Sequence, residues 1–244
     1  MDSQKLLSIY FQRIVRSSST RATTSITASV SSEVFVCYTE HMNTEIEVKF
    51  VNVDHDIIRG KLEEIGALLE QPMRLMRRVV IDTDFMKSKN AFLRVRDEGD
   101  KVTATYKQFD ALSVDGAKEI EITVSDFQST VDLLVAAGLP HTSFQESKRE
   151  TWRLGEVEIV LDLWPWLDPY IEIEADSEDA LKTMANQLGL DWNEAVFGDV
   201  MEAYKKQYPH LAEHDTVGDI PFVRFDDPLH DLFDPSSKSS KLIR

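Results

Sequence analysis

The chain after residue 42 is dominated by an alternation of apolar and charged positions. The first such segment, 44–53, carries charged side chains at every second position and apolar side chains between them: Glu45, Glu47 and Lys49 against Ile46, Val48 and Phe50. A period of two predicts a β-strand whose two faces meet different surroundings. Similar segments between turn residues predict further strands at 73–82, 92–97, 102–109, 117–124, 143–153, 156–163 and 170–175.

Helical patterns occur at only a few points between these strands. Asp54 is a good N-cap for an amphipathic helix over 56–70, and further helices are predicted at 125–137, 177–188 and 194–207. Short turns join most of the strands, so strand and helix do not alternate as in a Rossmann-type fold. We therefore expect an α+β fold, in which eight antiparallel strands form a closed β-barrel with the helices packed outside it.

The two ends of the chain differ from the middle. Residues 1–41 are rich in Ser and Thr and lack the apolar stretch of a secretory signal. We expect a disordered extension or a start site placed too far upstream of Met42; an organellar transit peptide and a folded part of the domain are the alternatives. The domain is expected over 42–208. The tail 209–244, with prolines at 209, 221, 228 and 235, is expected to be irregular.

Composition narrows the classes of function. The 244 residues carry 27 basic and 43 acidic side chains, a net charge of −16, which disfavours duplex nucleic acid and anionic membranes as partners. Apolar runs are far shorter than the roughly 18 residues that cross a bilayer. The single cysteine, Cys37, cannot form an internal disulfide. We therefore expect a cytoplasmic protein, or an organellar one if 1–41 is a transit peptide, that is a monomer or a homodimer.

Charged residues along the predicted strands occur in pairs of one sign. The acidic pairs are Glu45/Glu47, Glu119/Glu121 and Glu172/Glu174, and the clearest basic pair is Arg94/Arg96. Each pair could lie on a solvated outer face. If the sheet closes and its apolar faces meet the outer helices, however, the charged faces line the lumen. Such a lumen would suit an oligoanion together with a divalent cation such as Mg²⁺ or Mn²⁺, which prefers carboxylate and phosphate oxygens.

Seven short motifs strengthen this interpretation by their order. The segment 45–49 reads ExExK, and it is followed by Leu93–Arg96, Thr105–Lys107, Lys118–Glu121, Lys148–Glu150, Leu161-Asp162 and Tyr170–Glu174. In this order, over about 42–175, they resemble the CYTH domain of the triphosphate tunnel metalloenzymes, and most closely its class IV adenylate cyclase-like branch. The resemblance implies an eight-stranded antiparallel tunnel that binds a small-molecule triphosphate with Mg²⁺ or Mn²⁺.

The resemblance also implies a role for each charged position. Phosphate binding falls to Lys49, Arg94, Arg96, Lys107 and Arg149, and metal binding to Glu45, Glu47, Glu172 and Glu174, with Glu119 and Glu121 as second-metal or supporting acids. Asp162 would orient or deprotonate the attacking group, and with Lys49 and Arg149 it forms the expected catalytic set.

Three local features depart from the family's pattern or leave a choice open. Leu167-Asp168-Pro169 stands where the family often has a glycine, so that loop is expected to differ. Lys148 and Arg149 are adjacent and must point to opposite faces of a strand, and we expect Arg149 to point inward. Trp164-Pro165-Trp166 could be a packed loop at the tunnel mouth or could stack on a nucleobase.

Three functions are compatible with these residues. The first is hydrolysis of an inorganic or organic triphosphate, and the second is cyclisation of ATP to cyclic AMP and pyrophosphate. The third is a non-catalytic module that binds polyphosphate or nucleotide. No P-loop, HExxH motif or Cys/His zinc spacing points elsewhere.

Overall fold

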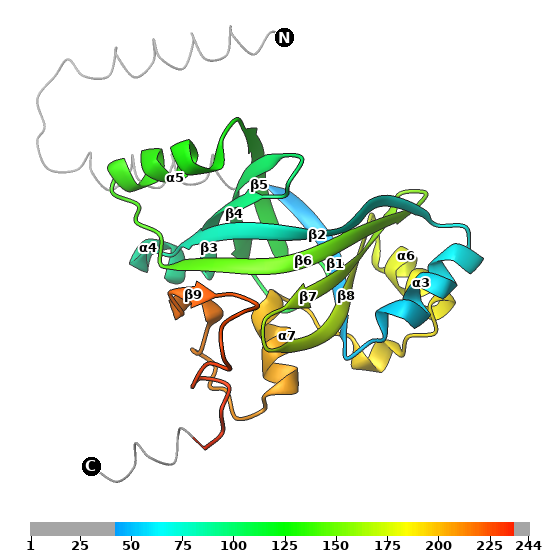
Figure 1. Ribbon diagram of the computed structural model, residues 1–244. Coiled ribbons are helices and arrows are strands. Elements are labelled where there is room, and N and C mark those ends of the chain that lie inside the picture. The colour runs from blue at the N-terminus through cyan, green and yellow to red at the C-terminus, as the bar shows by residue number, and fades with distance from the viewer. Residues whose placement is uncertain (1–41, 237–244) are drawn as a thin grey trace, which may run out of the picture. The chain divides into compact units, whose positions relative to one another are not determined.

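The computed structural model describes residues 42–236, and a closed antiparallel β-barrel forms its centre (Figure 1). Its eight strands are β1 (Asn43–Val51), β2 (Leu68–Ile81), β3 (Ala91–Asp97), β4 (Val102–Phe109), β5 (Ala117–Val124), β6 (Ser143–Leu154), β7 (Val157–Trp164) and β8 (Leu167–Ala175). They are ordered β2-β3-β4-β5-β1-β8-β7-β6, and pairing of β2 with β6 closes the barrel. The predicted fold class is confirmed.

The helices cover the apolar outer face of the barrel. They are α3 (His55–Glu64), α4 (Asp84–Lys87), α5 (Phe127–Ala136), α6 (Glu178–Gln187) and α7 (Val200–Gln207), with 3-10 turns η1 (Trp192–Glu194) and η2 (Val217–Asp219). Ile58 of α3 and Leu181 of α6 pack in one buried cluster with Val48 and Ile171, whose strands they cover. Burial of these apolar faces outside the barrel leaves the charged faces of the same strands to point inward.

Two loop segments extend the barrel wall beside β1. β5 pairs with β1 only at Asn43–Glu45, so the rest of that edge of β1 needs other backbone partners. The N–H of Glu47 donates to the carbonyl of Val114 at 3.0 Å, and Lys49 exchanges two backbone hydrogen bonds with Val196, both of 2.9 Å. These bonds satisfy the buried backbone of the segment that carries Glu47 and Lys49.

Some predicted boundaries are wrong. The helix predicted over 56–70 ends at Glu64, because Gly66 takes a positive φ of 79° and β2 already begins at Leu68. Between β2 and β3, where no helix is predicted, residues Asp84–Lys87 form the short helix α4. Likewise, the helix predicted over 194–207 begins only at Val200, where the side chain of Asp199 accepts a hydrogen bond from the N–H of Met201.

The last hairpin of the barrel is tighter than predicted. β8 begins at Leu167 rather than 170, and Leu167 pairs directly with Trp164. Only Pro165 and Trp166 form the turn, and Trp166 has a φ of 64°. Proline sets the backbone of the first central residue in such a turn. The Trp164-Pro165-Trp166 segment is therefore packed: Trp164 is 5% exposed, and the Trp166 indole donates to the carbonyl of Asp227.

The described part of the tail, up to residue 236, packs on the barrel. The short strand β9 (Phe222–Val223) pairs in parallel with β6 at Phe144 and Gln145, and Phe233 stacks on Tyr204 of α7. The expected lack of regular structure therefore does not extend to 217–223. The expectations for 1–41 lie outside the described residues. Within 42–236, no helix is long and apolar enough to cross a membrane.

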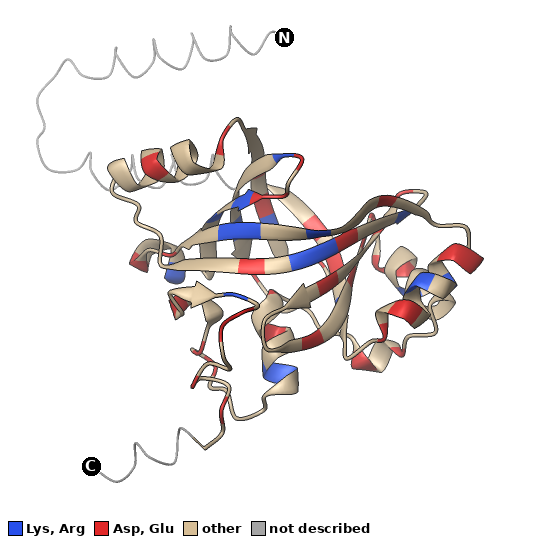
Figure 2. Ribbon diagram, viewed as in Figure 1, with Lys and Arg blue, Asp and Glu red and all other residues tan. Residues whose placement is uncertain are grey.

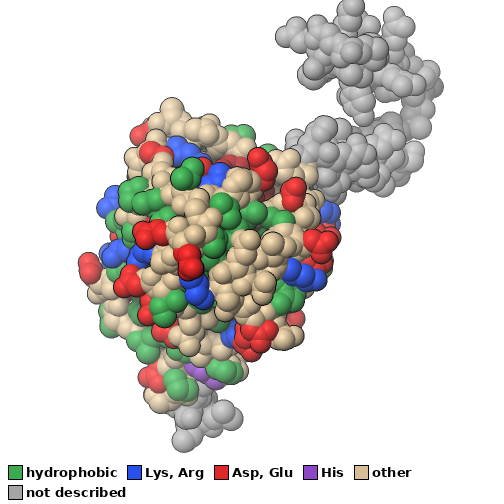
Figure 3. All heavy atoms as spheres, turned by 90° about the vertical axis from the view of Figure 1, so that its right-hand side faces the viewer, with side chains coloured by type: hydrophobic (Ala, Val, Ile, Leu, Met, Phe, Trp, Pro, Cys, Tyr) green, Lys and Arg blue, Asp and Glu red, His purple; other side chains and the backbone are tan. Residues whose placement is uncertain are grey.

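Figure 3 shows the face on which α3 and α6 lie. Acidic and basic side chains are scattered over it among apolar ones, and no continuous basic surface forms there. In Figure 2, by contrast, basic and acidic positions follow the strands of the barrel. The charged positions of the strands therefore point to the barrel interior as the place of a site.

Candidate functional site

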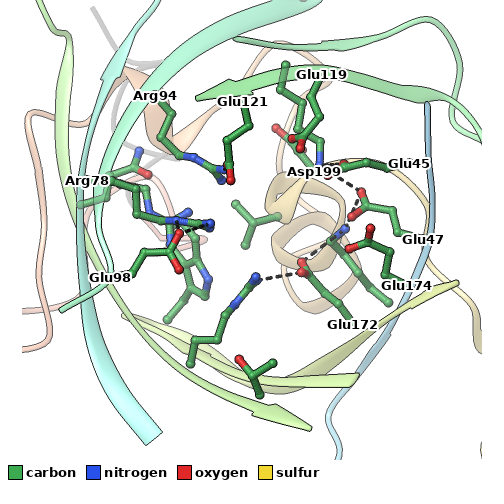
Figure 4. A pocket seen from close by; sticks show the side chains of 18 of the residues that line it. Glu45, Glu47, Arg78, Arg94, Glu98, Glu119, Glu121, Glu172, Glu174 and Asp199 are labelled. Carbon is green, nitrogen blue, oxygen red and sulfur yellow. Dashed lines mark hydrogen bonds and ion pairs between the residues drawn. The ribbon is translucent and has the colours of Figure 1, made fainter. Parts of the chain in front are cut away.

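A cavity of about 590 Å³ occupies the lumen of the barrel (Figure 4). It is lined by side chains that share the inward face of their strands, as the period of two requires. All of the predicted site residues line it except Asp162: Glu45, Glu47, Lys49, Arg94, Arg96, Lys107, Glu119, Glu121, Arg149, Glu172 and Glu174. Six strands therefore contribute to one site the charges that the sequence places far apart.

Cations and carboxylates are divided between two sides of the lumen. The adjacent strands β6, β2 and β3 contribute the arginines of one wall: Arg149, Arg74, Arg78, Arg94 and Arg96. The adjacent strands β5, β1 and β8 contribute the glutamates of the other: Glu119, Glu121, Glu45, Glu47, Glu172 and Glu174. Figure 4 shows Arg78 and Arg94 across the lumen from Glu45, Glu47 and Glu174.

Two lysines contact the acidic wall, Lys49 from β1 and Lys107 from the neighbouring strand β4. The Lys49 ammonium contacts Glu47 at 3.1 Å and Glu172 at 3.4 Å. Burial opposes its charge, but these carboxylates raise the pKa of Lys49 above its usual value. Lys107 pairs with Glu45 and lies 3.6 Å from Glu47. Both lysines are therefore held as cations by carboxylates of the same wall.

Arg149 links the two walls. Its guanidinium bonds both oxygens of Asp162, with 2.8 Å from Nε to Oδ1, and reaches Glu172 at 2.7 Å. Although burial acts in the opposite direction, Lys49 and Arg149 hold the pKa of Glu172 well below its usual range. Lys148, the neighbour of Arg149, points away from the lumen, and its ammonium lies 4.6 Å from the Phe225 ring centre. The inward orientation expected of Arg149 is the one observed.

Carboxylates in the acidic wall outnumber the cations that contact them. Burial and the neighbouring Glu45 raise the pKa of Glu119 to about 8. Burial, together with Glu45 and Glu158, raises the pKa of Glu174 to about 7. Repulsion of this kind is relieved by a cation, and carboxylate oxygens are the donors that Mg²⁺ and Mn²⁺ prefer.

The donor set therefore fits a divalent metal in its chemistry. The carboxylates are not arranged as metal ligands in this structure, since among residues 42–236 no three or more His, Cys, Asp or Glu side chains converge on a common point. Glu45, Glu47 and Glu172 are instead turned toward Lys49, Lys107 and Arg149.

Several residues that line or support the cavity escaped the sequence analysis. Glu98 looks like a turn residue, but its carboxylate is buried against Arg96 at 2.6 Å and Arg74 at 3.6 Å. It is in phase with Arg94 and Arg96, and that signal could have revealed it. Asp199 and the segment Thr216–Gly218 come from the C-terminal part, where no strand pattern points to a lumen.

A closed antiparallel barrel with arginines facing glutamates across its lumen is the architecture of the triphosphate tunnel proteins. The chain belongs to the CYTH domain family, whose model matches residues 43–197. No curated protein matches it at a significant level.

Three solved structures with a similar fold come from two archaea and a bacterium. A protein from Pyrococcus horikoshii OT3 is 23% identical, with a TM-score of 0.57 over 65% of this chain and 98% of its own. A conserved hypothetical protein from Pyrococcus furiosus is 18% identical, with a TM-score of 0.57 over 66% and 99%. A proposed adenylate cyclase from Vibrio parahaemolyticus is 17% identical, with a TM-score of 0.57 over 67% and 98%. At these identities the likeness shows the fold.

Proposed function

We propose that this protein hydrolyses a small-molecule triphosphate, inorganic or organic, with Mg²⁺ or Mn²⁺ inside the barrel. The observation that carries the proposal is the division of the lumen into an arginine wall and a glutamate wall. A triphosphate has several negative charges in a row, and the arginine wall matches them. A protein with a net charge of −16 repels such a ligand everywhere except where cations are concentrated.

The phosphate-binding residues in this proposal are Arg94, Arg96, Arg149, Lys49 and Lys107. Each is already a partner of a carboxylate, so binding exchanges an internal ion pair for a charge-assisted hydrogen bond to phosphate. The contact of Arg94 with Glu121 is long, at 3.6 Å, and Nε of Arg94 is buried without a partner among the described residues. Arg94 is thus the least committed member of this set.

The metal-binding residues are Glu45, Glu47, Glu172 and Glu174, supported by Glu119 and Glu121. A divalent cation bound there would neutralise charge on the phosphates and provide a water molecule for attack. The chain's own contribution is to bring the carboxylates together at the cost of mutual repulsion, which Lys49 and Lys107 offset until a metal enters. Phosphoryl transfer then depends on positioning and charge neutralisation rather than on a protein nucleophile.

Asp162 is better suited to positioning than to proton transfer. Its carboxylate is 1% exposed, does not line the cavity and accepts two hydrogen bonds from Arg149. A general base must come within hydrogen-bond reach of the proton that it removes. We therefore assign to Asp162 the orientation of Arg149.

One incubation separates this function from its two alternatives. Purified protein is mixed with tripolyphosphate, thiamine triphosphate or ATP, each with Mg²⁺ or Mn²⁺, and the products are separated. Orthophosphate release supports hydrolysis, whereas cyclic AMP with pyrophosphate identifies a cyclase. Binding without any product identifies a non-catalytic module. Arg77→Ala is the matched control, because Arg77 is exposed on the outer face of β2.

A further inference from the structure

Arg78 differs from every other cation of the lumen. Each other Lys or Arg that lines the cavity has a carboxylate oxygen within 3.9 Å. Arg78 has no such partner among the described residues, although it is only 7% exposed. Its guanidinium donates to Ser147 Oγ at 2.5 Å and lies 4.4 Å from the ring centre of Trp164. A buried cation without a counter-ion is costly unless an anion binds beside it.

The surroundings of Arg78 repel a second cation and favour an anion. Burial and the charges of Arg94, Arg96 and Arg149 all act to lower the pKa of Arg78. Nε of Arg78 and Nε1 of Trp164 are buried without hydrogen-bond partners among the described residues. Hydrogen-bond donors therefore gather at this point, and no carboxylate among the described residues lies within ion-pair distance of Arg78.

This point lies at the closed end of the lumen. The lining there consists of Trp164, Tyr170, the start of α7 at Asp199-Val200, and the tail segment Thr216–Gly218. Trp164, Tyr170, Val217 and Gly218 are buried. In Figure 4 the helix that begins at Asp199 crosses the far end of the barrel.

The opposite end is open. Its rim consists of charged side chains that reach solvent: Glu70, Asp100, Lys101, Arg153 and Glu158. A linear ligand can therefore enter from this rim and stop against the closed end.

The tail segment is held firmly in this position. The Ser143 hydroxyl donates to the carbonyl of Ile220 at 2.5 Å, and the Gln145 amide donates to the carbonyl of Val217 at 3.3 Å. β9 then fills the edge of β6 beyond the end of β7. The tail residues that make these contacts all lie beyond 43–197, the part of the chain that the family model matches.

We infer that Arg78 binds the unesterified terminal phosphoryl group of the substrate at this closed end, so that the protein selects phosphate chains with one free end. The inference rests on the proposed function and specifies its substrate class. A monoesterified chain can place its free end at Arg78 and its organic group at the open rim. A chain esterified at both ends would have to place its second organic group against the buried Trp164 and Thr216–Gly218, beside the Arg78 guanidinium.

The test compares two ligands that differ in one end. Adenosine 5′-tetraphosphate has one free terminal phosphoryl group, and P1,P4-di(adenosine-5′) tetraphosphate has none. Each is titrated calorimetrically into the full chain with EDTA present, so that binding is measured without turnover, and tripolyphosphate is titrated as a reference. We expect wild type to bind the free-ended ligand at least about tenfold more tightly, the effect of one charge-assisted hydrogen bond.

Arg78→Gln assigns the effect to the residue, with Arg77→Gln as the matched control. Arg78→Gln should lose about tenfold in affinity for the free-ended ligand and little for the doubly esterified one, while Arg77→Gln keeps the wild-type difference. The variant removes an unpaired buried charge, so its ligand-free melting temperature should rise, and stabilisation by tripolyphosphate should shrink.

The remaining outcomes overturn either the inference about Arg78 alone or the proposed function together with it. Equal wild-type affinity for both ligands, or an equal loss for both in Arg78→Gln, overturns this inference while tripolyphosphate binding leaves the proposed function in place. If tripolyphosphate does not bind at all and no triphosphate is cleaved with metal present, the proposed function and this inference both fail.

Discussion

Arg149 and Asp162 lie directly opposite each other on β6 and β7, and the guanidinium bonds both carboxylate oxygens. The Asp162 side chain is 1% exposed, whereas Arg149 lines the cavity. The Asp162 carboxylate therefore fixes the orientation of the Arg149 guanidinium, and with it the direction in which the N–H groups not bonded to Asp162 point. This fork-like pairing is more restrictive than a single contact.

Asp162→Asn is expected to act through Arg149. Loss of the buried charge should lower stability by about 3 kcal/mol, and a misplaced Arg149 should raise KM for the triphosphate more than it lowers kcat. The pH dependence of kcat should keep its acidic limb, because Asp162 transfers no proton in the proposed reaction. Steady-state kinetics between pH 5 and 9 check this, and disappearance of the acidic limb would identify Asp162 as a base instead.

Glu119→Gln is expected to stabilise the metal-free protein by an amount that grows as the pH rises above about 4.5 and levels off above about 8. The folded-state pKa of Glu119, about 8, lies above its ordinary value, so folding becomes less favourable as pH rises from about 4.5 to 8. Glutamine carries no charge at any pH and avoids this loss. Allowing for solvent screening, we expect a gain of about 1–2 kcal/mol at pH 9 and almost none at pH 4.

Denaturant unfolding at both pH values, with EDTA present, measures this difference. Added Mn²⁺ should stabilise wild type more than the variant, because the proposed metal site loses a charge. A gain that is the same at pH 4 and pH 9 would show that repulsion between Glu45 and Glu119 is not its cause.

Arg94→Ala and Glu47→Ala should lower turnover in different ways. Arg94 would contact the triphosphate, so its loss should reduce kcat/KM by about tenfold to a hundredfold at every metal concentration. Glu47 would act through the metal, so raising Mn²⁺, which binds such sites more tightly than Mg²⁺, should partly restore activity. Turnover measured against metal concentration separates the two. Curves that coincide for wild type and both variants are incompatible with the proposed site.

Gly116→Ala should disturb the wall beside Glu47. A Cβ at Gly116 would lie 2.0 Å from the carbonyl oxygen of Ala111, within the loop whose Val114 holds the N–H of Glu47. We expect the free energy of unfolding to fall by about 1–3 kcal/mol and the stabilisation of the protein by added metal to become smaller. Gly60→Ala is the control, because nothing lies within 4 Å of its Cβ and it should stabilise α3 by about 0.5–1 kcal/mol. Thermal unfolding and metal titrations of both variants check this.

The inward-facing charges were predictable because strand geometry enforces them. Once Glu45, Glu47 and Lys49 share a face, any closed barrel whose opposite face is covered by helices must turn them into the lumen. Periodicity does not say which strands close the barrel. The β2–β6 pairing places Arg74 opposite Arg149. Closure of the barrel could be predicted only from the resemblance to a family, because no local sequence pattern indicates it.

The features that escaped prediction depend on long-range contacts. The apolar run of 67–69 continues the helical pattern after Glu64, but Gly66 adopts a positive φ and the chain turns into β2. Likewise, nothing local in Thr216–Gly218 indicates that this segment lines the cavity, because hydrogen bonds to Ser143 and Gln145 hold the tail there. Arg78 follows the same period of two as the other inward-facing charges, but its lack of a carboxylate partner among the described residues is a property of the assembled barrel.

The closing pair of the barrel also governs how the domain can fold. β2 ends at residue 81 and β6 begins at residue 143, so their pairing closes a loop that contains three other strands and two helices. Contacts over such sequence separations form slowly. Until they form, the arginines of β2 and β3 face water, and their mutual repulsion is screened. The arginines are confined in one lumen only when β6 adds Arg149 to them and β7 adds its partner Asp162. Barrel closure is therefore the step at which ligand and salt should most strongly change the folding rate.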